Sequence, residues 1–178
     1  TGGAIAGSGI SYQHLKEVIG ICKAYVSRVG EGPFPTELHG AEGDHLRKLG
    51  AEFGATTGRP RRCGWFDVEL LRHAARVNGL TSLALTKLDV LSNYDEILIG
   101  RSYRRSGKAL DAFPSSGLED VQVEYEKLPG WKTDISQAKK LEDLPKNCRA
   151  YVDRLVELSE VPVKLISVGA GREETIVL

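Results

Sequence analysis

The sequence has 178 residues, of which 41% are hydrophobic and 27% are charged, as in one globular domain or one large piece of a domain. Lysine and arginine total 24, aspartate and glutamate also total 24, and this balance excludes a global field that would draw the protein to nucleic acid or an anionic membrane. Any anionic ligand must therefore be bound by a local group of positive side chains.

Targeting segments and cysteine motifs are not evident in the sequence. No apolar run approaches the roughly 20 residues of a membrane span, and the start TGGAIAGSGI lacks the basic region of a signal peptide, so we expect a cytoplasmic protein. Cys22, Cys63 and Cys148 form no CxxC pair, which predicts reduced thiols rather than disulfides or a zinc site. Because the chain starts at Thr1 and contains no methionine, we expect it to be a fragment.

The first 50 residues are predicted to contain two helices and one irregular loop. Residues 11–27 carry apolar side chains at three- and four-residue spacings behind Ser11, which is typical of an amphipathic helix. The segment VGEGPFPTELHG at 29–40 contains two prolines and repeated glycines, so we expect an ordered but irregular loop. A short helix is predicted around Asp44 to Leu49.

A polar loop, a helix and a strand follow. The glycine-bearing stretch GATTGRPRRCG at 54–64 is the most unusual loop in the chain. Asp67 is a suitable cap for a helix that ends at Asn78-Gly79. The apolar residues of this helix are predicted to face inward: Leu70, Leu71, Ala74, Ala75 and Val77. Directly after it, LTSLALT has the length and character of a buried parallel strand.

The remaining elements are predicted to lie around this strand. Residues 96–103 and 121–127 alternate apolar and polar side chains, which indicates exposed, peripheral, antiparallel strands, with LPGWKTD turning away after the second. Pro145 is suited to the first turn of a helix that buries an apolar stripe from Cys148 to Val156. PVKLISVG predicts a final strand with a glycine turn before ETIVL, and no internal domain boundary is evident.

The segment Thr86–Asp89, TKLD, directly follows the predicted buried strand. Ligands gather beyond the carboxyl ends of strands in open α/β sheets, so its position makes it a candidate site. The Asp89 carboxylate can accept hydrogen bonds from the N1–H and amino group of guanine, while the Lys87 stem lies along the ring. By itself TKLD can also be an exposed ion pair. The turn Ser167–Gly169 is a plain strand end by itself, and with TKLD it can cover the other edge of a base.

The loop at 55–62 gathers hydroxyl groups, a glycine and three guanidinium groups, which suit a ligand with carboxylates or phosphates. The alternative is a solvated basic turn. The N-terminal glycines do not satisfy GxxxxGK[ST], and the histidines show no HxxxH or HExxH spacing, so a phosphate loop and metal hydrolysis are poor fits.

Several segments together resemble one family, adenylosuccinate synthetase, in the same order along the chain. They are RVGEGPFPTEL, EFGATTGRPRRCGWFDVELLRHAARVNG, LTKLDVL, YEKLPGW and the closing SVGAG, and the likeness covers essentially the whole chain. The GRPRRCGW form is similar to eukaryotic, especially plant, members, in which case a plastid location is an alternative to the cytoplasm. The resemblance implies an α/β fold with a central, mostly parallel sheet flanked by helices and peripheral antiparallel strands, active as a homodimer.

The resemblance also implies a reaction and its binding residues. GTP phosphorylates the 6-oxygen of IMP, and the amine of L-aspartate then displaces phosphate. The aspartate-binding loop is expected at Ala55, Thr56, Thr57, Gly58, Arg59, Pro60 and Arg61. IMP is expected to contact Val29 and Arg59, while the family's IMP-binding threonine lies one residue before the glycine pair Gly2-Gly3, so that the chain is expected to start just past it. GTP is expected to contact Arg61, Lys87, Leu88, Asp89, Ser167, Val168 and Gly169.

The chain lacks the family's N-terminal GDEGKGK loop, with its catalytic aspartate and Mg²⁺ ligand, and the histidine that follows it. We therefore expect a C-terminal portion of a single synthetase domain, inactive alone, with no catalytic or metal residue of its own. Two alternatives are a non-catalytic guanine-nucleotide binding module and a structural fragment without ligand affinity. The intact aspartate loop favours the ligase.

Overall fold

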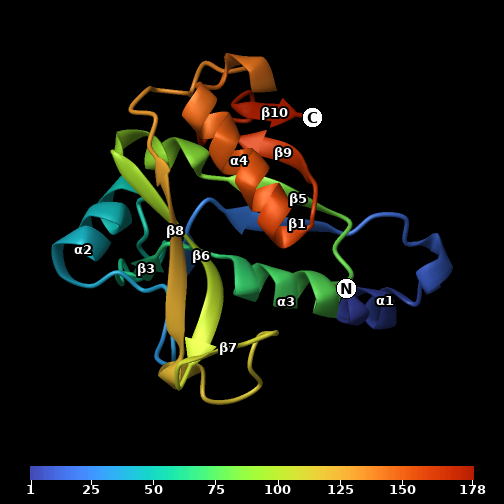
Figure 1. Ribbon diagram of the computed structural model, residues 1–178. Helices are drawn as coiled ribbons and strands as arrows, with labels where there is room; N and C mark the ends of the chain where they lie inside the picture. Colours follow the sequence, from blue (N-terminus) through green and yellow to red (C-terminus); the bar gives the residue numbers. More distant parts are fainter.

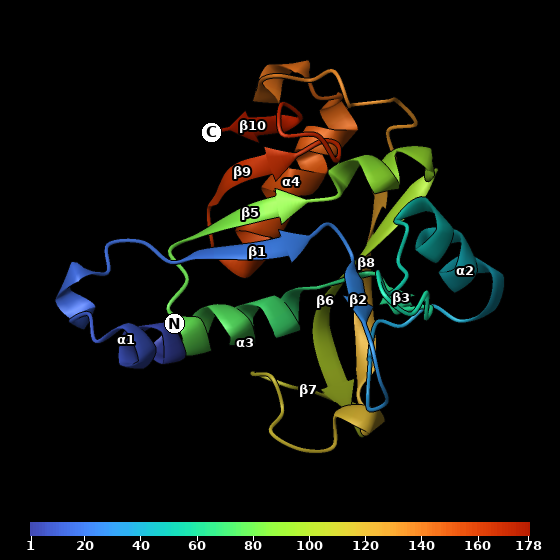
Figure 2. The same cartoon turned by 180° about the vertical axis from the view of Figure 1, so that it is seen from behind.

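A sheet in the order β1-β5-β9-β10 forms the centre of the molecule (Figures 1 and 2). The computed structural model describes residues 1–178. Strands β1 (Ile19–Lys23), β5 (Ser82–Thr86) and β9 (Val163–Ser167) run parallel, and β10 (Thr175–Val177) is antiparallel to β9. The predicted α/β class, with a mostly parallel central sheet, is confirmed.

The remaining strands form a second sheet and a separate pair. Strand β6 (Glu96–Arg105) pairs with β4 (Phe66–Asp67), β7 (Lys108–Ala109) and β8 (Gln122–Pro129), and β2 (Val26–Arg28) pairs with β3 (Arg62–Gly64). The antiparallel pairing of β6 with β8 confirms one prediction. The predicted exposure of residues 96–103 is wrong, because the alternate side chains Ile97 and Ile99 are 0% exposed and belong to the core.

Local signals set the ends of the helices. They are α1 (Gly2–Ser8), α2 (Gly40–Leu49), α3 (Val68–Asn78) and α4 (Lys146–Ser159), with short 3₁₀ turns at Tyr12–His14, Leu88–Asn93, Leu118–Asp120 and Leu141–Asp143. The Asp67 carboxylate accepts a hydrogen bond of 3.1 Å from the Leu70 amide, and Gly79 ends α3 in the left-handed region at φ 64°. Both were predicted, since capping depends on neighbours in the sequence.

The helix predicted over residues 11–27 is wrong. After a 3₁₀ turn at Tyr12–His14, the chain enters strand β1, which pairs in parallel with β5 from Ile19↔Ser82 to Lys23↔Thr86. The Leu80 side chain packs closely over Gly20 of β1, where a Cβ atom would lie 2.5 Å from Leu80 Cδ1. Four-residue spacings fit both a helix and a strand, and the non-local partner β5 decides between them.

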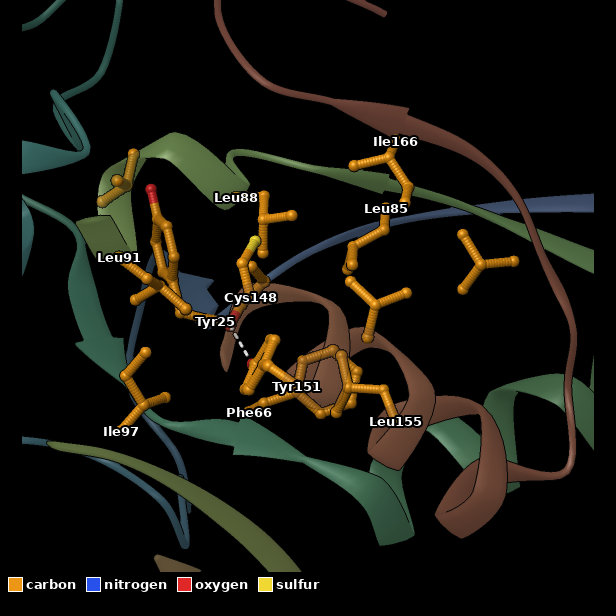
Figure 3. Packing of buried hydrophobic residues seen from close by; sticks show 14 of the residues in the cluster. Tyr25, Phe66, Leu85, Leu88, Leu91, Ile97, Cys148, Tyr151, Leu155 and Ile166 are labelled. Carbon is orange, nitrogen blue, oxygen red and sulfur yellow. Dashed lines mark hydrogen bonds between the residues drawn. The ribbon is translucent and has the colours of Figure 1, made fainter. Parts of the chain in front are cut away.

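The core lies between the parallel sheet and α4. Figure 3 shows Tyr151 and Leu155 of α4 beside Leu85 of β5 and Ile166 of β9. The Tyr151 hydroxyl donates a hydrogen bond of 2.7 Å to the backbone oxygen of Ala24, and both residues are fully buried. This bond joins α4 to the end of β1, and the predicted apolar stripe of α4 is confirmed.

The opposite face of the parallel sheet carries exposed apolar side chains. Ile21 is 80% exposed and Val177 is 75% exposed, and the register places both on one face with Ala84. No helix lies in front of this face in Figure 2, and β1 is an edge strand. On α3, Leu70 and Val77 are 40% and 66% exposed, so their predicted inward position is wrong. Leu70 lines a cavity of about 480 Å³ together with residues of β1.

Candidate functional site

The carboxyl ends of the three parallel strands meet at one edge of the sheet, as the arrowheads in Figure 2 show. Lys23 ends β1, the segment Lys87–Asp89 follows β5, and the turn Ser167–Gly169 begins at the last residue of β9. Strand β5 lies between the other two, so the two segments predicted to read guanine are neighbours. This edge is where open α/β sheets bind their ligands.

Asp89 and the turn after β9 line one cavity of about 480 Å³. Its lining comprises Asp89, Ser92, Asn93, Lys132, Thr133, Asp134, Ser136, Val168, Gly169, Ala170 and Glu174. Burial raises the pKa of the Asp89 carboxyl, nearby Glu174 raises it further, and Lys87 opposes them. A carboxylate that is partly withdrawn from water is well suited to accept charge-assisted hydrogen bonds from a base. Leu88 is 0% exposed, so its side chain belongs to the core and faces no ligand.

Lys87 occupies a left-handed backbone conformation at φ 59°. Its ammonium group donates a hydrogen bond of 2.6 Å to the backbone oxygen of Gly50, at the end of α2. Lys87 does not line the cavity that contains Asp89. The lysine therefore connects the turn after β5 to the segment that leads into the arginine-rich loop.

Glu174, which the sequence did not single out, stabilises the turn after β9 through hydrogen bonds. Its carboxylate accepts a hydrogen bond from the Gly171 amide, and its backbone oxygen accepts one of 2.9 Å from the Val168 amide. A Cβ atom on Gly169 would lie 2.5 Å from the Glu174 carboxyl, so a larger residue there would displace the Glu174 side chain. The Ser167 hydroxyl donates to the Gly169 oxygen at 2.7 Å, which closes the turn.

Residues 55–60, with the sequence ATTGRP, form an exposed loop whose two ends are joined by backbone hydrogen bonds. An isolated bridge pairs Phe53 with Pro60, and the Gly54 amide donates to the Arg59 oxygen at 2.9 Å. The Gly58 amide donates to the Gly54 oxygen at 2.8 Å, with Gly58 at φ 64°. The side chain of Arg59 makes no hydrogen bond or ion pair within the chain, so the loop presents a free guanidinium group to solvent.

The end of this loop at Arg61 contacts Glu52, another residue that the sequence did not single out. The Glu52 side chain is 0% exposed and accepts hydrogen bonds from Lys23, Tyr25 and Arg61. Its partners come from β1, the β1–β2 turn and the far end of the loop. A single acidic residue immediately before an arginine-rich loop was the only sequence signal for this cluster.

Val29 is 58% exposed and directly follows β2. Arg62, which follows the loop, donates to the backbone oxygens of Gly30 at 3.1 Å and Gly32 at 2.8 Å. The segment of Val29 and the loop are thus held together through β2, β3 and Arg62. Thr1 lies elsewhere, where its hydroxyl donates to the Asn78 oxygen at 2.8 Å.

The site offers carboxylate, hydroxyl, ammonium and guanidinium groups for binding. No three or more histidine, cysteine or acidic side chains of residues 1–178 gather in a group that could hold a metal ion. The cysteines are unpaired, and burial raises the pKa of Cys22 to about 12. None of the helices has the length and apolar character of a membrane span. A carboxylate-lined cavity and a guanidinium-bearing loop together suit a purine base and an acidic substrate.

Known proteins match this chain over nearly its full length. A family model described as adenylosuccinate synthetase matches residues 1–176. The adenylosuccinate synthetase of Pelobacter propionicus is 59% identical over 99% of the chain, which covers 42% of that relative. The chloroplastic adenylosuccinate synthetase of Zea mays is 54% identical over 98% of the chain, which covers 37% of it.

A solved structure gives the same result. The fully ligated adenylosuccinate synthetase of Plasmodium falciparum matches with a TM-score of 0.96 and 39% identity, over 100% of this chain and 43% of that one. The chain thus spans well under half the length of each of these relatives. On the family model and these identities, the chain belongs to the adenylosuccinate synthetase family.

Proposed function

We propose that this chain is the C-terminal portion of a GTP-dependent ligase, and that it supplies the binding sites for guanine and L-aspartate. The longer protein joins IMP and L-aspartate to give adenylosuccinate, GDP and phosphate. The observation that carries the proposal is the single cavity lined by Asp89 after β5 and by Val168 and Gly169 after β9. Asp89 and Ser167 are 78 residues apart in the sequence. The two segments are neighbours in the structure because β5 and β9 are adjacent strands of the sheet.

Asp89 carries the choice of base in this proposal. Its carboxylate accepts the N1–H and amino hydrogens of guanine, a donor pair that adenine does not present. Val168 and Gly169 cover the other edge of the ring, and Lys87 supports the turn through its bond to Gly50. Leu88 contributes through the backbone, because its side chain is buried.

In this proposal the loop from Ala55 to Arg61 binds L-aspartate. Thr56 and Thr57 supply hydroxyl groups, and the free guanidinium group of Arg59 supplies a planar pair of donors for a carboxylate. Arg59 also approaches IMP, whose ribose lies by Val29, and Arg61 serves the nucleotide phosphates. Gly58 and Pro60 shape the backbone of the loop, in keeping with the φ of Gly58 and the bridge at Pro60.

The open face of the parallel sheet supports the view that the rest of a longer protein packs against this chain. Parallel sheets are normally covered on both faces, whereas Ile21 is 80% and Val177 is 75% exposed. Strand β1 is an unpaired edge beside the cavity that contacts α3. We place the catalytic base, the general acid and the Mg²⁺ ligands in that N-terminal part, where Mg²⁺ supplies charge neutralisation during phosphoryl transfer.

The active form that we propose is a homodimer of the longer protein. Its partners are GTP, IMP and L-aspartate, without nucleic acid or membrane. We propose the cytoplasm as its location, with the plastid as an alternative because the Zea mays relative is chloroplastic.

A chimera tests the proposed function. The chain replaces the matching 42% of the Pelobacter propionicus relative, and formation of adenylosuccinate is followed by chromatography with Mg²⁺, GTP, IMP and L-aspartate. We expect turnover that requires all three substrates, and none from the isolated chain. A folded chimera that binds GDP without forming product would instead support the non-catalytic guanine-binding module.

A further inference from the structure

Glu52 is a buried carboxylate held by side chains from separate segments. Its Oε1 accepts hydrogen bonds from Lys23 Nζ at 2.7 Å and from the Tyr25 hydroxyl at 2.6 Å. Its Oε2 accepts one from Arg61 Nη1 at 2.8 Å. The side chain of Glu52 is 0% exposed, so it can touch no ligand itself. Whatever it contributes to a ligand site must act through these neighbours.

The charges around Glu52 do not cancel. Burial opposes ionisation, but the hydrogen bonds from Lys23, Tyr25 and Arg61 lower the pKa of Glu52 to about 2, so it is ionised at neutral pH. One negative charge therefore faces the two positive charges of Lys23 and Arg61, which are 29% and 33% exposed. The cluster keeps a net positive charge that faces solvent. In a chain without overall charge, such a local excess is what an anionic ligand requires.

Arg61 is oriented with part of its guanidinium group left free. The Arg61 backbone amide donates to the backbone oxygen of Glu52 at 3.0 Å, and the Arg61 backbone oxygen accepts from Arg47 Nε at 2.6 Å. Its Nη1 is engaged by Glu52, whereas its Nε and Nη2 have no partner within the chain. Arg59, by contrast, is unrestrained at the exposed part of the loop. A fixed guanidinium group with unused donors loses little conformational entropy when an oxyanion binds.

We propose that Glu52 is a positioning residue that fixes Arg61, so that the unused guanidinium donors of Arg61 meet an oxyanion of a bound substrate. The inference rests on the proposed function, which places Arg61 at the substrates. The inference adds Glu52, which lies outside the predicted loop, to the residues that support substrate binding. It also gives a reason why the charge of Glu52 is buried. Lys23 completes the cluster by balancing the carboxylate when the Arg61 guanidinium engages a ligand.

A double-mutant cycle in the chimeric synthetase tests the proposal, with Glu52→Gln, Arg61→Ala and the double variant. The KM values for GTP and for L-aspartate and the kcat are measured for each. We expect Glu52→Gln to raise, by about tenfold, the same KM that Arg61→Ala raises, and to have little further effect in the Arg61→Ala background. A merely structural role would add its effect equally in both backgrounds.

Tyr25→Phe is the matched control, because it removes one hydrogen bond to Glu52 and leaves Arg61 untouched. We expect it to lower the melting temperature while both KM values stay within about twofold. Where Glu52→Gln fails to fold, Arg61→Lys keeps a positive partner for Glu52 but loses the guanidinium fork. It is then expected to raise the same KM with an unchanged melting temperature.

Different outcomes separate the inference from the proposed function. If Arg61→Ala raises a KM and Glu52→Gln leaves it unchanged, or raises it equally in both backgrounds, the positioning role is overturned and the substrate loop stands. If neither Arg61→Ala nor Arg61→Lys alters any KM, the role of Arg61 and that of Glu52 fall together. Retention of the base preference for guanine would then leave the cavity at Asp89 as the surviving part of the proposed function.

Discussion

The ammonium group of Lys87 donates a hydrogen bond of 2.6 Å to the backbone oxygen of Gly50, two residues before Glu52. Lys87 belongs to the turn proposed to bind guanine, and Glu52 supports the loop proposed to bind L-aspartate. The short segment from Gly50 to Glu52 therefore contacts both candidate sites. Substrate loops and nucleotide turns that share one support are expected to influence each other's affinity.

Replacing Lys87 with methionine tests this link. Lys87→Met keeps the apolar stem but removes the bond to Gly50, so we expect both the KM for GTP and the KM for L-aspartate of the chimera to rise several-fold. Lys127→Met is the control, because Lys127 is 66% exposed on β8. A rise confined to GTP would show that the bond to Gly50 carries no coupling.

Asp89→Asn tests the choice of base. An amide loses the charge-assisted hydrogen bonds to guanine, which are worth about 1.5–3 kcal/mol, so we expect GTP use to weaken roughly ten- to a hundredfold. Because an amide also offers a donor, selectivity between GTP and other nucleoside triphosphates should relax. Steady-state kinetics with GTP, ITP and ATP measure both effects, with exposed Asp153→Asn as control. Unchanged selectivity would remove Asp89 from base reading.

Arg59→Leu tests the loop. The guanidinium group of Arg59 is free within the chain, so its removal should leave the fold intact and raise the KM for L-aspartate by tenfold or more, about 1.4 kcal/mol at least. Arg101→Leu is the control, because Arg101 is 50% exposed and 3.8 Å from its partner Glu124. An unaltered dependence on L-aspartate would place Arg59 outside the site.

The bond between Tyr151 and Ala24 is expected to stabilise the fold rather than the site. Tyr151→Phe leaves a buried backbone oxygen without its donor, which should lower the free energy of unfolding by about 1–3 kcal/mol. Urea denaturation of the chain measures this loss, with Tyr12→Phe as control because Tyr12 is 71% exposed. Equal stability of the two variants would mean that water replaces the lost bond.

The low pKa of Glu52 is expected to make the stability of the fold depend on pH. Its pKa is about 2 in the fold against an ordinary 4.5, so its ionisation stabilises the fold fully above 4.5, and the contribution is lost as pH falls from 4.5 to about 2. The difference in unfolding free energy between the chain and Glu52→Gln should therefore shrink across that window. Exposed Glu173→Gln should show no such change. A constant difference would contradict the low pKa.

The sequence predicted the elements whose signals are local. Asp67 and Gly79 bracket α3, Pro145 precedes α4, and the run LTSLALT became the buried strand β5. Residues 11–27 were misread because their spacing suits a helix and a strand alike, and only pairing with β5 decides between the two. That pairing is non-local and leaves no mark in the segment itself.

The candidate site was predicted in part for the same reason. The motifs TKLD, SVG and ATTGR were visible as strings, and the structure brings the first two to one cavity. Glu52 was missed because Lys23 and Tyr25 lie far from it in the sequence and meet it only in the fold. Leu70 was predicted to face inward, but it is 40% exposed and lines a cavity together with residues of β1.

The most direct test of the guanine site is a calorimetric titration of this chain with GDP and, in parallel, with ADP. We expect GDP to bind and ADP not to bind, and we expect Asp89→Asn to abolish the difference. Equal binding of the two nucleotides, or binding of neither by the folded chain, would contradict a guanine site formed by these residues.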